Sequence, residues 1–359
     1  MKLEQFFETT AYVAEKEDDL HIMGQVIERF TAERPLEGAR VVVGHLIVLN
    51  SITMIEALYR GGAQVALCSA FPTQSMDALS EELTRHGLPI LPAEKAVLQG
   101  DIFMDTAGFL GSHGTPRAAV EVTRTGEYVY DQADFPVITI DQARIKLFED
   151  FLGTGESFVR GWEMFRPQDP LPGKCAVQFG YGKVGSGVAY HLRKEGVQVV
   201  IADLSPEALQ RAAQDGFEVL EAARTPEMQA ALAVAEVVIG VTGIRSAVGE
   251  TVPAEWLRAN NPVLAAMGYH EFGDEFTEEE LLGGADVPVN FHLVQPTLNR
   301  YMDATLAAQV LAVEELVKHT GEYRHGLTPL PKEIDDWLWN SWIELWPEED
   351  LSGVELRTA

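Results

Sequence analysis

The sequence predicts an α/β protein of two doubly wound, Rossmann-like domains, with C-terminal helices that return to the first domain. Apolar runs of strand length alternate with helical segments in both halves of the chain, which is typical of parallel sheets covered by helices on both faces. The chain of 359 residues is long enough for about two domains, and 46% of its residues are hydrophobic, enough to fill two cores. One stretch, residues 174–203, has the strand, glycine turn, helix and second strand of a βαβ unit in that order.

The 174–203 stretch has the pattern of a dinucleotide site. Its G-x-G-x-x-G turn supplies a tight bend, room for a pyrophosphate and close packing of a helix whose N-terminus favours an anion. The second strand ends at Asp203, where a carboxylate can bind ribose hydroxyls and would repel a 2′-phosphate, so NAD is expected rather than NADP. A glycine-rich turn without a ligand is the alternative, and the complete unit disfavours it. The cofactor residues expected from this unit are Gly180, Gly182, Lys183, Val184, Gly185 and Asp203.

Composition excludes several classes of partner. Lys and Arg number 27 against 55 Asp and Glu, a net charge of −28, which disfavours nucleic acid and anionic membranes because either needs a basic face. Cys68 and Cys175 lie in apolar, strand-like runs, so we expect buried thiols in a reducing cytoplasm rather than a disulfide. The charged N-terminus does not resemble a signal peptide, and no apolar run has the roughly 20 residues that a membrane helix needs. No metal-ligand motif occurs, and no metal is expected.

The expected elements follow from apolar periodicity and from glycine and proline breaks. The strands expected in the first half are 40–43, 64–68, 88–91, 101–104 and 135–140. Those expected in the second half are 175–179, 197–202, 217–220, 237–241, 262–267 and 287–291. The helices expected outside the 174–203 unit are 1–31, 51–59, 77–85, 143–152, 206–215, 301–319 and 334–346.

The G-T-G-E-S segment at 153–157 is expected to end a helix and to form the hinge between the domains. The first domain would then be 1–152 completed by 299–330, and the NAD domain 153–298. Residues 331–359 would form a C-terminal helix with four tryptophans, for which contact with another subunit is expected, since aromatic residues are enriched in interface cores. We therefore expect a homo-oligomer.

The order and spacing of several motifs resemble the adenosylhomocysteinase (S-adenosylhomocysteine hydrolase) family over about residues 36–338, as a shortened and divergent member. The motifs are F-P-T-Q at 71–74, E-V-T-R-T-G at 121–126, F-E-D-F-L-G-T-G-E-S at 148–157, F-G-Y-G-K-V-G-S-G at 179–187 and L-P-K-E-I-D at 330–335. The resemblance implies an enzyme that holds NAD and transiently oxidises the 3′-hydroxyl of a nucleoside. A base then removes the 4′ proton, the 5′ substituent leaves, water adds and the ketone is reduced again.

Matched positions imply roles for further residues. Asp105 matches a carboxylate near the 4′ and 5′ positions and is the expected general base, and Glu149 matches an aspartate that binds ribose hydroxyls. Asn290 matches an asparagine that binds the nicotinamide carboxamide. Other expected cofactor contacts are Thr123, Thr125, Thr242, Gly243 and Gly268.

The chain departs from the family around the nucleoside. The family lysine aligns with Ile145, and Lys146 replaces it only if the helix has shifted, because one residue rotates a helical side chain by about 100°. Two family histidines fall beside His45 and at Tyr269, with His270 next. These histidines could instead be structural, Lys146 a solvated helix charge, and Tyr269 a phenol in place of an imidazole. Further departures are Val122, Arg124, Thr297 and a missing C-terminal tail, whose lysine and tyrosine reach a neighbouring subunit's NAD in the family.

The sequence therefore predicts an NAD-dependent enzyme acting on a small-molecule nucleoside, by thioether hydrolysis or by an elimination that leaves an unsaturated sugar, as in nucleoside-antibiotic biosynthesis. An authentic S-adenosylhomocysteine hydrolase is one alternative. A non-catalytic NAD-binding regulatory protein and a net dehydrogenase are the others.

Overall fold

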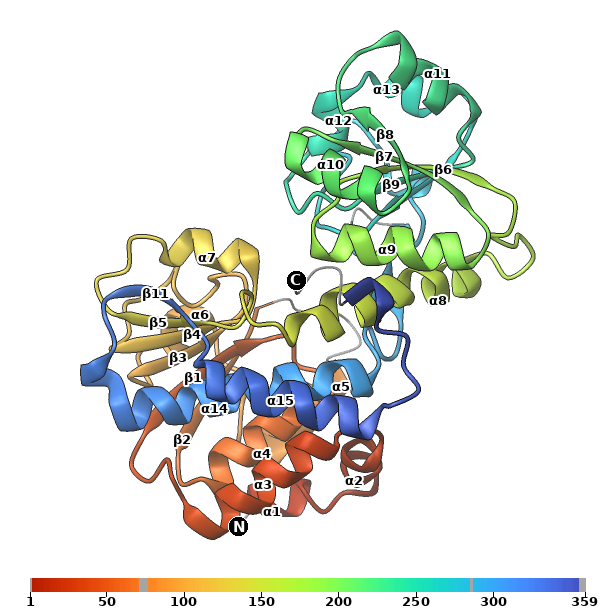
Figure 1. The fold of residues 1–359 in the computed structure, drawn as a ribbon. Coiled ribbons are helices and arrows are strands. Elements are labelled where there is room, and N and C mark those ends of the chain that lie inside the picture. The colour runs from red at the N-terminus through yellow and green to blue at the C-terminus, as the bar shows by residue number, and fades with distance from the viewer. Residues whose placement is uncertain (1, 71–76, 285–286, 355–359) are drawn as a thin grey trace. The chain divides into compact units, whose positions relative to one another are not determined.

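The computed structural model describes residues 2–70, 77–284 and 287–354, so the F-P-T-Q motif at 71–74 lies outside the described residues. The chain divides into two compact units (Figure 1). Unit 1 comprises Met1–Lys146 and Asn299–Glu349, and unit 2 comprises Leu147–Leu298 and Asp350–Ala359. Each unit is built on its own parallel sheet, which confirms the predicted pair of doubly wound α/β domains.

Unit 1 holds a six-stranded parallel sheet in the order β11-β5-β4-β3-β1-β2. Its strands are β1 (Arg40–His45), β2 (Gln64–Ser69), β3 (Ile102–Asp105), β4 (Ala118–Glu121), β5 (Pro136–Thr139) and β11 (Gly326–Pro329). Its helices are α1 (Lys2–Phe6), α2 (Thr10–Glu17), α3 (His21–Glu33), α4 (Ile52–Arg60), α5 (Asp77–Arg85), α6 (Ala93–Ala96), α7 (Arg124–Tyr130), α14 (Asn299–His319), η5 (Thr320–Glu322) and α15 (Lys332–Leu345). Because all strands run the same way, their carboxyl ends share one edge of the sheet.

Several predictions for unit 1 were wrong in detail. The expected helix over 1–31 is three helices, and Asp19, between the second and third, has a left-handed φ of 60°. Residues 88–91 make only the Leu67–Ile90 bridge, because Pro89 has no N–H for a ladder. Strands β4 and β11 and helix α7 were not predicted; β11 is a proline-containing strand at the edge of the sheet.

The C-terminal tryptophans pack partly within unit 1. Trp339 and Trp342 are buried, and the Trp342 indole N–H donates to the Arg300 carbonyl at 2.6 Å. Trp337 is 40% exposed. The sequence expectation that these tryptophans serve a subunit contact is therefore wrong for the two buried ones. No helix among the described residues is both long and apolar enough to cross a bilayer.

Unit 2 holds a five-stranded parallel sheet in the order β10-β9-β6-β7-β8. Its strands are β6 (Cys175–Phe179), β7 (Gln198–Asp203), β8 (Glu218–Glu221), β9 (Val237–Gly240) and β10 (Val263–Ala266). Its helices are η2 (Phe148–Thr154), α8 (Gly155–Phe165), α9 (Lys183–Lys194), α10 (Pro206–Gln214), α11 (Pro226–Val234), α12 (Ala247–Thr251), α13 (Ala254–Leu257), η3 (Glu278–Glu280) and η4 (Val289–His292). Counted from β6, the strand order is 3-2-1-4-5, that of a dinucleotide-binding fold with its switch point between β6 and β9. The strand expected over 287–291 is instead the 3₁₀ turn η4.

The G-T-G-E-S segment is helical rather than a break. The π-helix η2 runs directly into α8, so the helix expected to stop at Gly153 continues to Phe165. Its glycines serve helix packing: a Cβ on Gly155 would lie 2.5 Å from the Gly187 carbonyl carbon, and one on Gly187 would lie 2.2 Å from the Phe151 oxygen. The helices therefore approach at a distance that only glycine allows.

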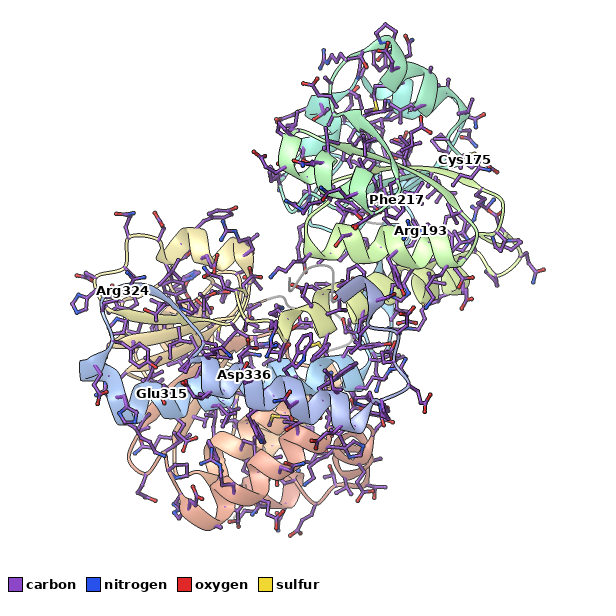
Figure 2. All side chains as sticks on the ribbon, in the orientation of Figure 1. Cys175, Arg193, Phe217, Glu315, Arg324 and Asp336 are labelled. Carbon is purple, nitrogen blue, oxygen red and sulfur yellow. The ribbon has the colours of Figure 1, made fainter. Side chains whose placement is uncertain are left out.

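The C-terminal end of helix α9 is also held in place by side-chain contacts. Arg193, labelled in Figure 2, lies over the Phe217 ring with 4.3 Å from Cζ to the ring centroid, and its Nη1 donates to the Asp215 carbonyl at 2.6 Å. These contacts hold the helix that follows the glycine turn against the segment leading into β8.

Candidate functional site

The turn after β6 contains three glycines, and each is required for a different reason. Gly180 has φ +105°, and a Cβ there would lie 2.6 Å from the Val241 carbonyl oxygen. A Cβ on Gly185 would lie 2.5 Å from the Gly180 oxygen, so this glycine lets α9 pack on the turn. A Cβ on Gly182 would meet nothing within 4 Å. The chain itself therefore does not require glycine at 182, whereas close approach of a pyrophosphate does.

Two side chains fix the shape of this turn. The buried Gln178 amide donates to the carbonyls of Gly180 and Gly185 at 2.9 and 2.8 Å. Asp203, at the end of β7, accepts from the Tyr181 N–H at 2.8 Å through Oδ2 and from the Ser205 N–H at 2.8 Å through Oδ1. Asp203 thus reaches the glycine turn, where a ribose-binding acid belongs. Gln178 was missed by sequence reasoning, and only its polarity within an apolar strand could have revealed it.

The start of α9 suits an anion. Gly182 caps the helix without a side-chain hydrogen bond, so no side-chain cap covers the N–H groups of the first turn. Lys183 opens this helix and forms an ion pair with Asp150 at 3.2 Å, and Val184 packs against the unit 2 core. The turn, the helix start and Asp203 together fit a dinucleotide, and these residues would hold its pyrophosphate and a ribose.

The loop after β9 is shaped by a buried carboxylate that the sequence did not single out. Glu271 accepts from the Thr242 hydroxyl at 2.6 Å and from the Gly243 N–H at 2.8 Å. Thr242 in turn accepts from the Ile244 N–H at 3.0 Å. A Cβ on Gly268 would lie 2.1 Å from Glu271 Oε1, so Gly268 makes room for this carboxylate.

Other predicted residues of unit 2 take varied positions. Asn290 is buried on η4, and its Nδ2 donates to the Pro296 carbonyl at 3.3 Å. Its Oδ1 has no hydrogen-bond partner and could accept from an amide group of a ligand. Glu149 lies on η2. Tyr269 packs edge-on against Phe291, and burial raises the pKa of its phenol. His270 is exposed with φ 53°, the left-handed region.

In unit 1, Asp105 lies at the carboxyl end of β3, as predicted, and is 0% exposed. Its Oδ1 accepts from the Thr106 and Leu110 N–H groups at 2.8 and 2.9 Å. Its Oδ2 accepts from the Gly111 N–H at 3.0 Å and the Tyr130 hydroxyl at 2.7 Å. Burial raises the pKa of this carboxyl, and the hydrogen bonds oppose that rise. A carboxylate with four donors organises its loop and has little accepting capacity left.

Glu121, the register partner of Asp105 on β4, completes this arrangement. It accepts from the Ala107, Gly108 and Thr123 N–H groups and from the Thr123 hydroxyl, the last at 2.6 Å. Burial, followed by the charge of Asp105, raises the pKa of Glu121 to about 8. Thr123 also caps α7, and the exposed Thr125 bonds to it at 3.3 Å. Glu121 was not expected to have a structural role.

His45 and Lys146 come together in unit 1. His45 ends β1, and its Nδ1 lies 3.0 Å from the Leu46 carbonyl oxygen, which can only accept, so Nδ1 carries the proton and Nε2 the lone pair. Burial, and secondarily the charge of Lys146, lowers the pKa of His45. Lys146 is 2% exposed, which excludes a solvated helix charge. A π-helix begins two residues later, at Phe148.

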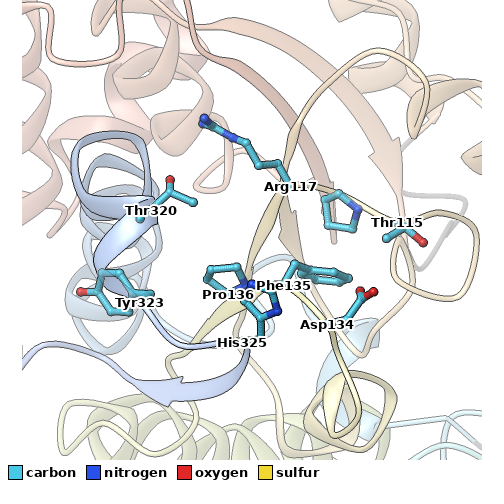
Figure 3. Close-up of a pocket in the computed structure, with 10 residues that line it drawn as sticks. Thr115, Arg117, Asp134, Phe135, Pro136, Thr320, Tyr323 and His325 are labelled. Atoms are coloured by element: carbon cyan, nitrogen blue, oxygen red, sulfur yellow. The ribbon is translucent and has the colours of Figure 1, made fainter.

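The pocket drawn in Figure 3 lies elsewhere in unit 1. Its volume is about 420 Å³, and it is lined by Arg117, Phe135, Pro136, Tyr323, His325 and neighbouring residues. These residues lie around the amino ends of β4, β5 and β11, whereas His45 and Asp105 lie at the carboxyl ends of β1 and β3. None of the predicted site residues lines it. Among the described residues, no group of three or more His, Cys, Asp or Glu side chains could hold a metal ion.

Comparison with known proteins identifies relatives of similar sequence and solved structures of similar fold. Residues 151–314 match the family described as S-adenosyl-L-homocysteine hydrolase, NAD binding domain. The adenosylhomocysteinase of Sulfolobus acidocaldarius is 25% identical over 89% of this chain and 87% of its own length. The S-inosyl-L-homocysteine hydrolase of Methanopyrus kandleri is 26% identical over 89% of this chain and 86% of its own. Among solved structures, a dipicolinate synthase from Bacillus halodurans aligns over 79% of this chain and 98% of its own, with 16% identity and a TM-score of 0.48.

The fold of unit 2 and its family match define an NAD-binding protein with a Rossmann-like domain, so the predicted cofactor is confirmed. The match and the full-length relatives together confirm the resemblance found in the motifs. Residues 151–314 match the family's NAD-binding domain, and the chain is similar to adenosylhomocysteinases over most of its length.

Proposed function

We propose that the protein is an NAD-dependent hydrolase of nucleoside 5′-thioethers, the substrate class to which S-adenosylhomocysteine and S-inosylhomocysteine belong. The observation that carries the proposal is the pairing of a neutral, buried His45 with a buried Lys146 at the carboxyl edge of the unit 1 sheet, in a chain whose other unit carries a dinucleotide turn. Ionisable groups held in this way are typical of catalytic sites.

Bound NAD would supply reversible oxidation of the ribose 3′ carbon. Once that carbon is a ketone, the neighbouring 4′ proton is acidic, and its removal requires a base that is unprotonated near pH 7. The lowered pKa of His45 and its Nδ1 hydrogen bond leave Nε2 in that form. The Lys146 ammonium would stabilise the negative charge that develops on the 3′ oxygen as the proton leaves. Loss of the thiolate from the 5′ carbon, addition of water across the resulting 4′,5′ double bond, and return of the hydride to the 3′ carbon would complete the reaction with no net redox change.

This assignment changes the expected role of Asp105. Both of its oxygens are already engaged by donors from the protein, whereas His45 Nε2 has a free lone pair in the neutral imidazole. We therefore assign Asp105 and Glu121 to the organisation of the 106–111 loop. We place the base at His45.

The test is a substrate panel with product identification. Protein supplemented with NAD is mixed with S-adenosylhomocysteine, S-inosylhomocysteine, adenosine and inosine, and products are identified by mass while free thiol is titrated. The proposal predicts homocysteine and the matching nucleoside from at least one thioether. An unsaturated sugar without water addition would make the protein a lyase. NAD binding without turnover of any thioether would favour the regulatory alternative and overturn the proposal.

A further inference from the structure

The buried side chain of Glu271 is unexplained by the predicted chemistry. Its residue is 0% exposed, and it follows β10 at the same sheet edge as the glycine turn. Space for it is created by two glycines: a Cβ on Gly240 would lie 2.7 Å from the Glu271 Cβ, and one on Gly268 would lie 2.1 Å from its Oε1. Burying a carboxylate is costly unless it is hydrogen-bonded, so this one has a specific task.

The task is visible in what the carboxylate binds. Its two oxygens accept from the Thr242 hydroxyl and the Gly243 N–H, the second and third residues after β9. Because the Thr242 hydroxyl donates to Glu271 and accepts from the Ile244 N–H, it is committed to shaping the turn. Gly243, with φ +70°, has the left-handed conformation that the turn requires.

The turn held by Glu271 lies directly behind the phosphate-binding glycines. A Cβ on Gly180 would lie 2.6 Å from the Val241 oxygen and 3.0 Å from the Thr242 nitrogen, so the two loops are in backbone contact. The turn also presents Ile244, a residue that is 64% exposed, at the switch-point edge of the sheet. Ligands of doubly wound sheets bind at this edge.

We propose that Glu271 is a positioning residue for the cofactor: its carboxylate fixes the Thr242–Ile244 turn against the glycine turn, and so presets the wall along which the dinucleotide lies. Glu271 acts through Thr242 and Gly243 and does not touch the ligand. The inference rests on the NAD site of the proposed function, but not on the reaction assigned to it.

The test measures NAD affinity by calorimetry in Glu271→Gln, Thr242→Val and the double variant. Each single variant loses one end of the same charge-assisted hydrogen bond, so we expect NAD to bind about tenfold more weakly in each. The double variant should bind no more weakly than either single one, because both changes break one unit. Thr242→Ser keeps the hydroxyl and should restore affinity. Faster amide exchange at 242–244 should accompany the loss.

The matched control is Asp303→Asn in unit 1. Asp303 is equally buried and accepts from the Ile22 and Met23 N–H groups at 2.7 and 2.8 Å. This variant should lower the unfolding temperature and leave NAD affinity unchanged. The inference is overturned if Glu271→Gln and Thr242→Val lower stability as the control does but bind NAD like the wild type. If Glu271→Gln does not fold, Thr242→Val alone decides in the same way. Absence of thioether hydrolysis with intact NAD binding would contradict the proposed function and leave this test in place.

Discussion

The substitution Gly182→Ala separates a glycine required by a ligand from glycines required by the fold. At Gly182 the backbone has φ −76° and ψ −163°, an extended conformation open to alanine, and the added methyl would meet no atom of the chain within 4 Å. A tolerated glycine-to-alanine change usually stabilises the folded state by about 0.4–1 kcal/mol, because the unfolded chain loses freedom. The protein without NAD should therefore unfold at the same temperature as the wild type or slightly above it.

The same methyl should obstruct NAD. If the pyrophosphate passes over Gly182, the added atom forces a shift of ligand or loop, a strain of about 1–3 kcal/mol on the scale of overpacking. That cost corresponds to NAD binding roughly 5- to 150-fold more weakly. Calorimetry with NAD and thermal unfolding without it measure the two effects separately.

The neighbouring glycines provide the controls. Gly180→Ala places a methyl 2.6 Å from the Val241 oxygen at φ +105°, and Gly185→Ala places one 2.5 Å from the Gly180 oxygen. Both should lower stability even in the absence of NAD. The reasoning is refuted if Gly182→Ala binds NAD like the wild type, or if it destabilises the ligand-free protein as much as Gly180→Ala does.

Asp203, the His45–Lys146 pair and Asp303 each allow a further test. Asp203→Ala should weaken NAD by about 1–3 kcal/mol, measured by calorimetry, and unchanged affinity would mean that the acid does not reach the ribose. His45→Gln should slow exchange of the substrate's 4′ proton by roughly 10²–10⁴-fold, and exchange at the wild-type rate would exclude this histidine as the base. Lys146→Met should move the acid limb of the pH–rate profile to higher pH, because Lys146 lowers the pKa of His45. Burial raises the pKa of Asp303 to about 7, above its unfolded value, so its contribution to stability is complete below about pH 4 and is lost as pH rises through 7. Denaturant unfolding from pH 4 to 8 should show a smaller decline in Asp303→Asn, and an identical decline would contradict the assigned titration.

The cofactor unit was predictable because its chemistry is local. The spacing of Gly180, Gly182 and Gly185 follows from one turn, and Asp203 follows from the length of one βαβ unit. The structure adds the reason for each glycine separately. It also shows the Rossmann strand order, which results from pairings between segments far apart in the sequence and is not encoded in any one of them.

The incorrect predictions of helices and strands also have physical causes. Residues 88–91 are apolar enough for a strand, but Pro89 removes a ladder donor. Strand β11 lies more than 180 residues from its partner β5 along the chain, and nothing local marks it. The π-helix replaced an expected break at Gly153, because Gly155 and Gly187 serve close helix packing that the sequence alone does not reveal.

At the candidate sites, the main feature that the sequence did not predict was the burial of single charged residues. Glu121 and Glu271 are 0% exposed, yet in the sequence each is one acid among 55. The available signal was a glycine near each acid in the sequence. A Cβ on Gly126 would lie 2.0 Å from the Glu121 carboxyl carbon, and Gly268 makes room for Glu271. Lys146 was ambiguous for the opposite reason, because only the fold shows that the side chain is buried.

We propose that the chain transiently oxidises a nucleoside and then removes its 4′ proton. The most direct measurement is mass-spectrometric and NMR analysis of nucleosides recovered from the NAD-loaded protein in deuterium oxide. Under this proposal, deuterium enters the 4′ position of a nucleoside thioether with the wild type and does so far more slowly with His45→Gln. Absence of deuterium at the 4′ position for every thioether tested, with NAD demonstrably bound, would contradict it.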